Sequence, residues 1–584
     1  MTEDIQIKSV AAHGEKYFNE REKLLSLPPE KILNYILEHP RPGDLVQSFP
    51  QEDFYFLIHD IGPEDSLALL AMASDAQWEY IIDLESWQRD RVDISALTKW
   101  IQLLLKANPG RLVEWLLKDK IELFEFYLFK NIEVIVREHD QDPADFGKEF
   151  FTFDDVYYIR IVEERVGAKP QGPDKKMAED VLPVLLERLA EFDHIKFQQV
   201  LFETRSVIPA ELEEEAYRLR NVRLAENGFL PFDEALGVYQ HLDPKDLQTR
   251  YSKVIAAEAG PRESLPVPLY PTRLIRDESL FSTALQAIEG YDLLQQLQTE
   301  FVALCNRIVT ADQKKIHDRE ALRHVVKKAC GYLSIGLGRL LDLKVLPAEH
   351  QKKVSAANLT RFPLLDIFRV GYGSALALKW RVEKWVEGSW FKAAGLPLSF
   401  WGESWLGVLG GLLLKRPLSY DNYKTGALYK EFSHNEDISQ TQVVLDAIAA
   451  FDDLFSHMNI KIKSVSANTL INHKNLILTL WARHYLDLSK DVRPLTLAEF
   501  KKFFNALWID ANTPRKIQQS VKTSFLNWLA EETGRDITEI SFRLGDSFEK
   551  LFGEIESEYG YVSEADLDPK YIHLFLLSTK IDPL

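Results

Sequence analysis

The sequence predicts an all-α protein of stacked short helices, with a small two-stranded β ribbon and a C-terminal helical domain. Apolar residues recur at the spacing of one helix face along most of the 584 residues, as in Phe54, Leu57, Ile58 and Ile61. Helix starts in which proline is followed by acidic residues are frequent near the N-terminus. One short region instead has the β-branched and aromatic composition of strands.

The helix starts recur at a fixed distance. A second proline follows the first by thirteen residues in three places: Pro29 and Pro42, Pro50 and Pro63, and Pro231 and Pro244. This distance corresponds to about three helical turns and a tight corner. Short helices cannot bury an apolar face alone, so we expect a superhelical, HEAT-like stack. The alternative is that proline followed by acid is a common helix start and the spacing is coincidence.

This rhythm resembles the cytosolic N-terminal superhelical domain of MgtE-type magnesium transporters. The resemblance covers only the N-terminal part of the chain and implies only stacked helices. The membrane part of those transporters has no counterpart in this sequence, so no transport function is implied.

Two strands are predicted inside the helical part. Ile132–Glu138 and Val156–Val162 are short, β-branched and aromatic, and an acidic loop separates them. We expect them to pair as a ribbon near residues 132–162.

Proline and glycine cluster at Gly167–Lys176 and at Gly260–Pro271, which indicates linkers. The second cluster divides the chain into two predicted domains. These are a helical-repeat domain at residues 20–256 and a C-terminal helical domain at residues 272–584.

The totals argue against several classes of protein. The 89 acidic residues exceed the 70 basic ones by 19, so nucleic acid is not expected as a main partner. Cys305 and Cys330 are too few for a disulfide scaffold or a four-thiolate zinc site. The best membrane candidate, Ser404–Leu414, has about half the length of a spanning helix. We expect a soluble, cytoplasmic protein without a transmembrane segment.

The densest charged segment is EEEAYRLRNVRLAENGFLPFDEALGVY, Glu213–Tyr239. A helical wheel places an apolar stripe on this helix, formed by Leu212, Ala216, Leu219 and Val222. Arg223 falls close to that stripe. A guanidinium there must be paired, because an unpaired buried charge costs several kcal/mol.

Two interpretations of this segment stay open. In the structural one, Glu215, Arg220, Arg223 and Glu226 form a buried ion network that fixes the order of the helices. In the functional one, Arg220 and Arg223 build an anion or substrate site, since charge clusters also mark sites.

Two stretches carry a family resemblance. Glu213–Gln240 and Ile61–Glu85 resemble an uncharacterised bacterial family of unknown function, and the likeness extends over most of the chain. The resemblance implies no activity, cofactor or catalytic residue.

The sequence LIHDIG, Leu57–Gly62, resembles the centre of HD-type metal-dependent phosphohydrolases, which are also all-helical. The resemblance implies His59 and Asp60 as ligands of a metal that activates water. The family pattern needs a further upstream histidine, and His39 is the only near candidate. A His-Asp pair also arises by chance, and the chain has a second at His317–Asp318.

An aromatic cluster extends from Trp380 to Trp405, and its helical spacing favours a core position. The alternative is an exposed surface for a partner or a membrane. The glycine-rich pieces Gly336–Leu341 and Gly371–Leu376 lack the third glycine of a nucleotide-binding turn. We therefore predict no cofactor.

The leading hypothesis is a non-catalytic, cytoplasmic interaction or scaffold protein that binds another protein through its helical-repeat surface. The contrasting hypothesis is an HD-type phosphohydrolase centred on His59 and Asp60. Only the second hypothesis requires a metal.

Overall fold

The computed structural model describes residues 17–25, 27–88, 90–162, 173–205, 208–226, 229–249, 275, 279–289, 291–313, 319–341, 347–458, 460, 471–509 and 514–578. The chain divides into two compact units, Met1–Val370 and Gly371–Leu584, which are called the N-terminal and C-terminal units below. The described residues are mostly helical, and their strands form three two-stranded sheets, so the all-α prediction is confirmed. The predicted boundary between residues 256 and 272 lies outside the described residues, as does the linker Gly260–Pro271.

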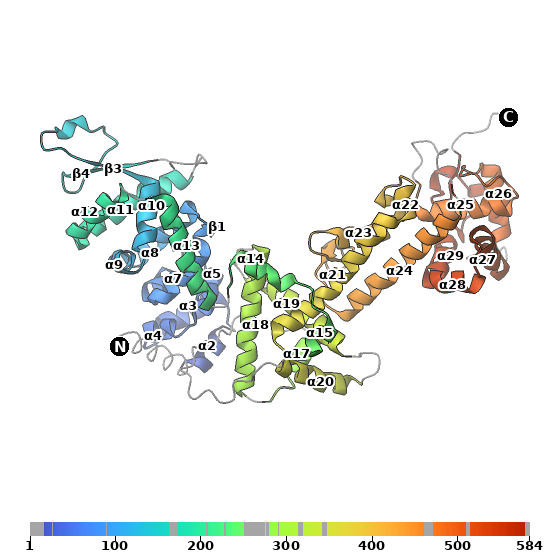
Figure 1. Ribbon diagram of the computed structural model, residues 1–584, viewed down its shortest axis with the longest axis horizontal. Coiled ribbons are helices and arrows are strands. Elements are labelled where there is room, and N and C mark those ends of the chain that lie inside the picture. Colours follow the sequence, from blue (N-terminus) through green and yellow to red (C-terminus); the bar gives the residue numbers. More distant parts are fainter. Residues whose placement is uncertain are drawn as a thin grey trace. The chain divides into compact units, whose positions relative to one another are not determined.

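The N-terminal unit begins with a stack of short helices (Figure 1). The helices are α2 (Phe18–Leu24), α3 (Pro29–Glu38), α4 (Pro42–Gln47), α5 (Gln51–Ile61), α6 (Leu67–Met72), α7 (Asp75–Glu85) and α8 (Ile94–Ala107). Helix α3 packs on α4 and α5, α5 packs on α7, and α6 packs on α4 and α8. Pro29 and Pro42 occupy the first turns of α3 and α4, where a missing N–H costs nothing.

The third proline pair is placed differently. Pro231 and Pro244 begin α14 (Phe232–Ala235) and α15 (Pro244–Thr249), with the 3-10 helix η2 (Leu236–Tyr239) between them. Helix α14 and η2 pack on α18 (Tyr291–Asp312), whereas α5 packs within the first stack. The carbonyl of Gly237 accepts a hydrogen bond from Nε of Arg369 at 2.9 Å, outside any helical ladder. The three proline pairs thus share the spacing of their helix starts, but the helices that follow Pro231 differ from α5 in what they pack on.

Between α7 and α14 the chain also forms β1 (Trp87–Gln88), β2 (Arg91–Val92), α9 (Pro109–Asp119), α10 (Ile121–Asn131), η1 (Pro143–Asp145), α11 (Pro173–Phe192), α12 (His194–Thr204) and α13 (Pro209–Glu226). The predicted ribbon is confirmed by β3 (Ile132–Val136) and β4 (Tyr157–Ile161). These strands pair antiparallel, with Ile132 opposite Ile161 and Val136 opposite Tyr157.

The rest of the N-terminal unit is a second helical layer. It contains α17 (Leu280–Leu285), α18, α19 (Arg319–Leu340), α20 (Ala348–Arg361) and the first turns of α21 (Leu364–Gly388). Cys305 and Cys330 are buried in α18 and α19 and form no disulfide. Burial raises the pKa of the Cys305 thiol well above its usual value, so this thiol stays protonated.

Helix α19 approaches the start of α21 closely at Gly336. A Cβ at this position would lie 2.0 Å from the carbonyl oxygen of Ile367. We expect Gly336→Ala to lower the free energy of unfolding by about 1–3 kcal/mol, because one backbone must move away from the other. Urea unfolding of the full chain measures this.

The matched control for Gly336 is Gly43→Ala in α4, where an added Cβ meets no atom within 4 Å. We expect no loss of stability there. Equal stability of Gly336→Ala and Gly43→Ala would show that the two helices are not held in this close approach.

The C-terminal unit is helical with one small hairpin. Its elements are α22 (Trp390–Ala393), η3 (Leu398–Trp401), α23 (Glu403–Leu413), β5 (Ser419–Tyr420), β6 (Tyr429–Lys430), α24 (Asn435–His457), α25 (His473–Tyr485), α26 (Leu497–Leu507), α27 (Gln519–Thr533), α28 (Ile537–Leu544), α29 (Asp546–Tyr559), η4 (Glu564–Asp566) and η5 (Pro569–Tyr571). Ser404–Leu414 falls mainly in α23. Among the described helices, none is both long enough and apolar enough to cross a bilayer.

The aromatic cluster is mostly core, as predicted. Trp401 is fully buried, whereas Trp380 is 48% exposed at the edge of the cluster. The ring of His473 stacks on Trp405 with centroids 4.3 Å apart, and Phe451 meets it edge-on. This histidine is the polar residue at the centre of the cluster.

Candidate functional site

Helix α13 has charged residues on both its inner and its outer side. Leu219 and Val222 are 36% and 55% exposed, so the predicted apolar stripe is wrong at these two positions. Ala216 and Leu224 are buried, and Arg220 and Arg223 are partly buried beside them. The helix packs on α7, α10 and β2 through this mixed surface. Polar contacts therefore contribute, together with Ala216 and Leu224, to holding α13 against its neighbours.

Arg223 is held by two acids of α7. Its Nε and Nη2 donate to the two carboxylate oxygens of Asp83, each at 2.8 Å, and its Nε lies 2.9 Å from Oε1 of Glu79. A bidentate pair of this kind is among the strongest side-chain contacts. The sequence anticipates a paired Arg223 but not these partners, which lie 140 positions away for Asp83.

The two glutamates that flank Arg223 in the predicted network lie elsewhere. Glu215 accepts from Arg218 at 2.6 Å on the outer side of α13. Glu226 is exposed in the last turn of α13. The helix stop predicted at Asn227–Gly228 lies outside the described residues.

We expect Arg223→Met to lower the free energy of unfolding by about 3 kcal/mol, because Asp83 would keep a buried charge without its bidentate partner. The side chain of Asp83 is only 4% exposed. Chemical unfolding of the full chain checks this value. Arg218→Met removes an exposed pair on the same helix and should cost less than about 1 kcal/mol. Equal costs for both variants would contradict a structural role of Arg223.

Arg220 contacts the same part of α7 in another way. Its Nε donates to the main-chain carbonyl of Asp83 at 2.6 Å, and its Nη1 lies 3.4 Å from Oδ1 of Asn221. The guanidinium also lies over the ring of Trp87, 5.4 Å from its centroid. Burial lowers the pKa of Arg220 to about 10, and the Asp83 charge offsets only part of this effect.

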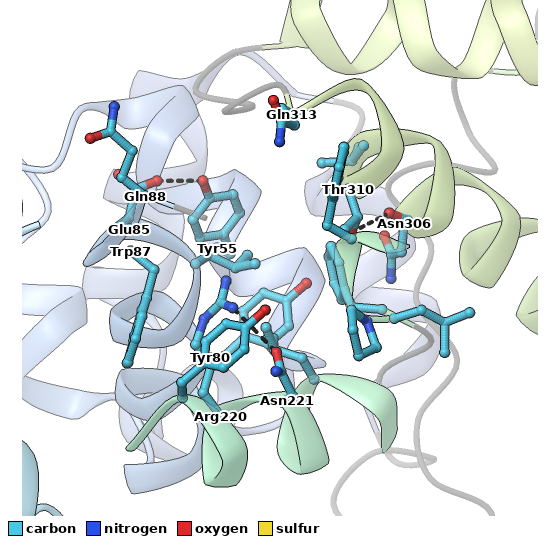
Figure 2. Close-up of a pocket in the computed structure, with 18 of the residues that line it drawn as sticks. Tyr55, Tyr80, Glu85, Trp87, Gln88, Arg220, Asn221, Asn306, Thr310 and Gln313 are labelled. Atoms are coloured by element: carbon cyan, nitrogen blue, oxygen red, sulfur yellow. Dashed lines mark hydrogen bonds between the residues drawn. The ribbon is translucent and has the colours of Figure 1, made fainter. Parts of the chain in front are cut away.

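Arg220 lines a cavity of about 490 Å³ within the N-terminal unit. Figure 2 shows Tyr55, Tyr80, Trp87 and Arg220 on one side of the cavity. Asn306 and Thr310 of α18 lie on the other side, and Gln313, which directly follows α18, also lines the cavity. The other lining residues are Phe56, Leu84, Glu85, Gln88, Tyr217, Asn221, Leu224, Phe229, Leu230, Pro231, Phe232, Val309 and Leu322. The walls are thus mainly aromatic and apolar, with amides and two charged groups among them.

The acid in this lining, Glu85, has its carboxylate in contact with two other side chains, Tyr55 and His59. Its Oε1 accepts the hydroxyl hydrogen of Tyr55 at 2.5 Å and lies 3.4 Å from Nε2 of His59. Tyr80 lines the cavity with a ring that is only 3% exposed. Burial, with the nearby charges of Glu52 and Asp53, raises the pKa of Tyr80 well above its usual value. Its hydroxyl is therefore a neutral donor at physiological pH.

Residues 14–578 match a family of unknown function, DUF6178. The chain belongs to the DUF6178 family. This confirms the family resemblance seen in the sequence. No curated protein and no solved structure matches the chain, and the likeness to the MgtE domain stays a prediction. The two stretches that carried the DUF6178 resemblance meet at this cavity: Ile61–Glu85 supplies Tyr80 and Glu85, and Glu213–Gln240 supplies Arg220.

In this DUF6178 protein, His59 of the predicted His-Asp pair lies beside the cavity, against Tyr55 and Glu85. The ring of His59 meets Tyr55 and Trp100, with centroids 4.5 and 5.9 Å away. His39 lies 3.4 Å from Glu20. Within the described part of the chain, no three His, Cys, Asp or Glu residues converge to hold a metal. His317–Asp318 lies outside the described residues.

The sequence did not single out Tyr80, Trp87 or the α18 residues of this cavity. They are ordinary aromatic and polar residues at helical spacing, and nothing local marks them as parts of one wall. The available signal was indirect: the two stretches that carry the family resemblance come together here.

Proposed function

We propose that this protein is a non-catalytic interaction or scaffold protein of the cytoplasm, which binds another protein through its helical N-terminal unit. The observation that carries the proposal is the aromatic-walled cavity between α5, α7 and α13 on one side and α18 on the other. Its volume of about 490 Å³ falls in the range of roughly 300–1,000 Å³ that is common for binding pockets.

The composition of the cavity suits a side chain of a partner. Tryptophan, tyrosine and arginine are the residues that most often dominate the energy of protein interfaces. Trp87, Tyr80, Tyr217 and Arg220 gather here around one hollow. A partner side chain that enters it would bury much apolar area at a small cost in conformational entropy, since the aromatic rings are already packed.

A tryptophan substitution that fills the cavity tests this proposal. Thr310 lines the cavity and donates its hydroxyl hydrogen to the carbonyl of Asn306 in α18. Thr299 makes the equivalent bond to Gln295 in the same helix but is exposed and does not line the cavity. Thr310→Trp and Thr299→Trp are therefore matched variants.

We expect affinity purification from native extract to recover one partner protein with the wild type and with Thr299→Trp. Thr310→Trp should recover much less of it, because the added indole occupies the hollow. Mass spectrometry with crosslinking identifies the partner and the site of contact. Equal recovery with Thr310→Trp, or no reproducible partner with the wild type, would refute the proposal.

A further inference from the structure

We infer that the cavity binds an organic carboxylate, with the guanidinium of Arg220 and the hydroxyl of Tyr80 as its donors. This inference rests on the proposed function insofar as the carboxylate belongs to a partner protein, and it names the group that is recognised. It gives Arg220 a different role from Arg223, although both belong to the same helix.

The charge on Arg220 favours an anion as the ligand of the cavity. Within the described residues this guanidinium has a main-chain carbonyl, an amide oxygen and an indole ring as partners, and it forms no ion pair. The charge of Asp83 in α7 acts on Arg220, but both carboxylate oxygens of Asp83 are bonded to Arg223. A partly buried cation without an anion is costly, and an anion that enters the cavity would offset that cost.

Two hydrogen-bond donors in the cavity wall, from Arg220 and Tyr80, favour a carboxylate. Neither Nη2 of Arg220 nor the hydroxyl of Tyr80 has a hydrogen-bond partner among the residues that the structure describes, and both side chains line the cavity. A carboxylate has two oxygens that accept bonds from donors of this kind. Neither atom is among the buried side-chain atoms that lack a partner, so both donors are open to an acceptor that enters the cavity.

The small number of charged residues in the cavity wall favours a monoanion over a polyanion. The cavity is lined by one cation, Arg220, and one acid, Glu85. Polyphosphates require several cations or a metal, whereas a monoanion needs one guanidinium. The acidic surplus of 19 charges on the whole chain further disfavours polyanions.

The remaining walls define the body of the ligand. Trp87, Tyr217, Phe229 and Phe232 offer apolar and aromatic surface, which suits an aromatic or bulky apolar group next to the carboxylate. Two sources fit this chemistry: a free aromatic acid, or the C-terminal carboxylate of a protein that ends in an aromatic residue.

The test compares acids with their amides by isothermal titration calorimetry at pH 7 on the full chain. The small probes are indole-3-propionate and indole-3-propionamide. The peptide probes are a pentapeptide ending in phenylalanine with a free carboxylate and the same peptide amidated. We expect at least one acid to bind the wild type roughly tenfold or more tightly than its amide, as for a charge-assisted hydrogen bond.

The variants assign the donors. Arg220→Gln should abolish the preference for the acid, and Tyr80→Phe should weaken binding of the acid by about fivefold, the effect of one neutral hydrogen bond. Arg218→Gln changes an exposed arginine of the same helix and should leave binding unchanged. Tyr80→Phe keeps the ring in place, so it tests the site even if Arg220→Gln lowers stability.

The outcomes separate this inference from the proposed function. Binding of the small acid alone supports the carboxylate site and counts against a protein terminus as the ligand. Binding of the free-carboxylate peptide supports both. Equal binding of acids and amides, or no binding of any probe, overturns the carboxylate site, while the matched tryptophan variants still judge the protein interaction by itself.

Discussion

Replacing Lys328 with methionine should lower the free energy of unfolding of the N-terminal unit by about 3–5 kcal/mol. Nζ of Lys328 in α19 lies 3.1 Å from Oδ2 of Asp312 in α18, and the two side chains are 6% and 5% exposed. The hydroxyl of Tyr239 donates to Oδ1 of the same carboxylate at 2.5 Å. Without Lys328, the buried carboxylate of Asp312 would lose this ion pair, and the Tyr239 hydroxyl carries no charge that could replace it.

Urea unfolding, followed by hydrogen exchange in peptides from α18 and α19, assigns the loss to the N-terminal unit. The control is Lys327→Met, an exposed neighbour in α19, which should change stability by less than about 0.5 kcal/mol. The double variant Lys328→Met with Asp312→Leu should recover most of the loss, because it leaves no unpaired charge. A small effect of Lys328→Met would mean that water reaches this pair.

The C-terminal unit should lose stability steeply in weak acid because of His473. Burial among aromatic rings and, to a smaller extent, the charge of Lys474 together lower the pKa of this imidazole from 6.5 to about 3. The unfolded chain binds a proton on His473 below about pH 6.5, whereas the folded chain does not until about pH 3. His473 therefore has no such effect above pH 6.5, and stability falls by about 1.4 kcal/mol per pH unit as the pH drops toward 3.

His473→Gln separates this effect from general acid unfolding. Glutamine does not titrate, so the unfolding free energy of the variant should depend less steeply on pH between 6 and 4, although the variant is less stable at pH 7. Unfolding curves at several pH values, read from peptides of α24 and α25, give the two slopes. Parallel slopes for wild type and variant would contradict a buried, neutral His473.

Local sequence signals predicted those elements whose causes are local. The β ribbon follows from β-branched and aromatic runs, and its observed strands fall within the predicted ranges. Pro29 and Pro42 mark real helix starts because proline at the first turn loses no hydrogen bond. The third proline pair also marks helix starts, but α14 packs on α18, since a cap determines where a helix begins and not what it packs on.

The face of α13 could not be read from its own residues. A helical wheel places the apolar side inward, but Leu219 and Val222 face outward because α7 offers Glu79 and Asp83 as partners for the other side. Those partners are remote in sequence. The charge density of Glu213–Tyr239 correctly drew attention to Arg220 and Arg223. Arg223 is paired because it binds the carboxylate of Asp83, whereas Arg220 binds only the main-chain carbonyl of the same residue. The sequence does not show which arginine meets which group.

Thermal unfolding with and without indole-3-propionate tests these different roles of Arg220 and Arg223 most directly. Arg223→Met should lower the unfolding midpoint of the N-terminal unit, and the ligand should still raise it. Arg220→Met should leave the midpoint near that of the wild type, because removal of an unpaired cation offsets the loss of its two hydrogen bonds and of its contact with the Trp87 ring. The ligand should no longer raise the midpoint of this variant. The reverse pattern, in which Arg220→Met destabilises and Arg223→Met abolishes the ligand effect, would contradict the account.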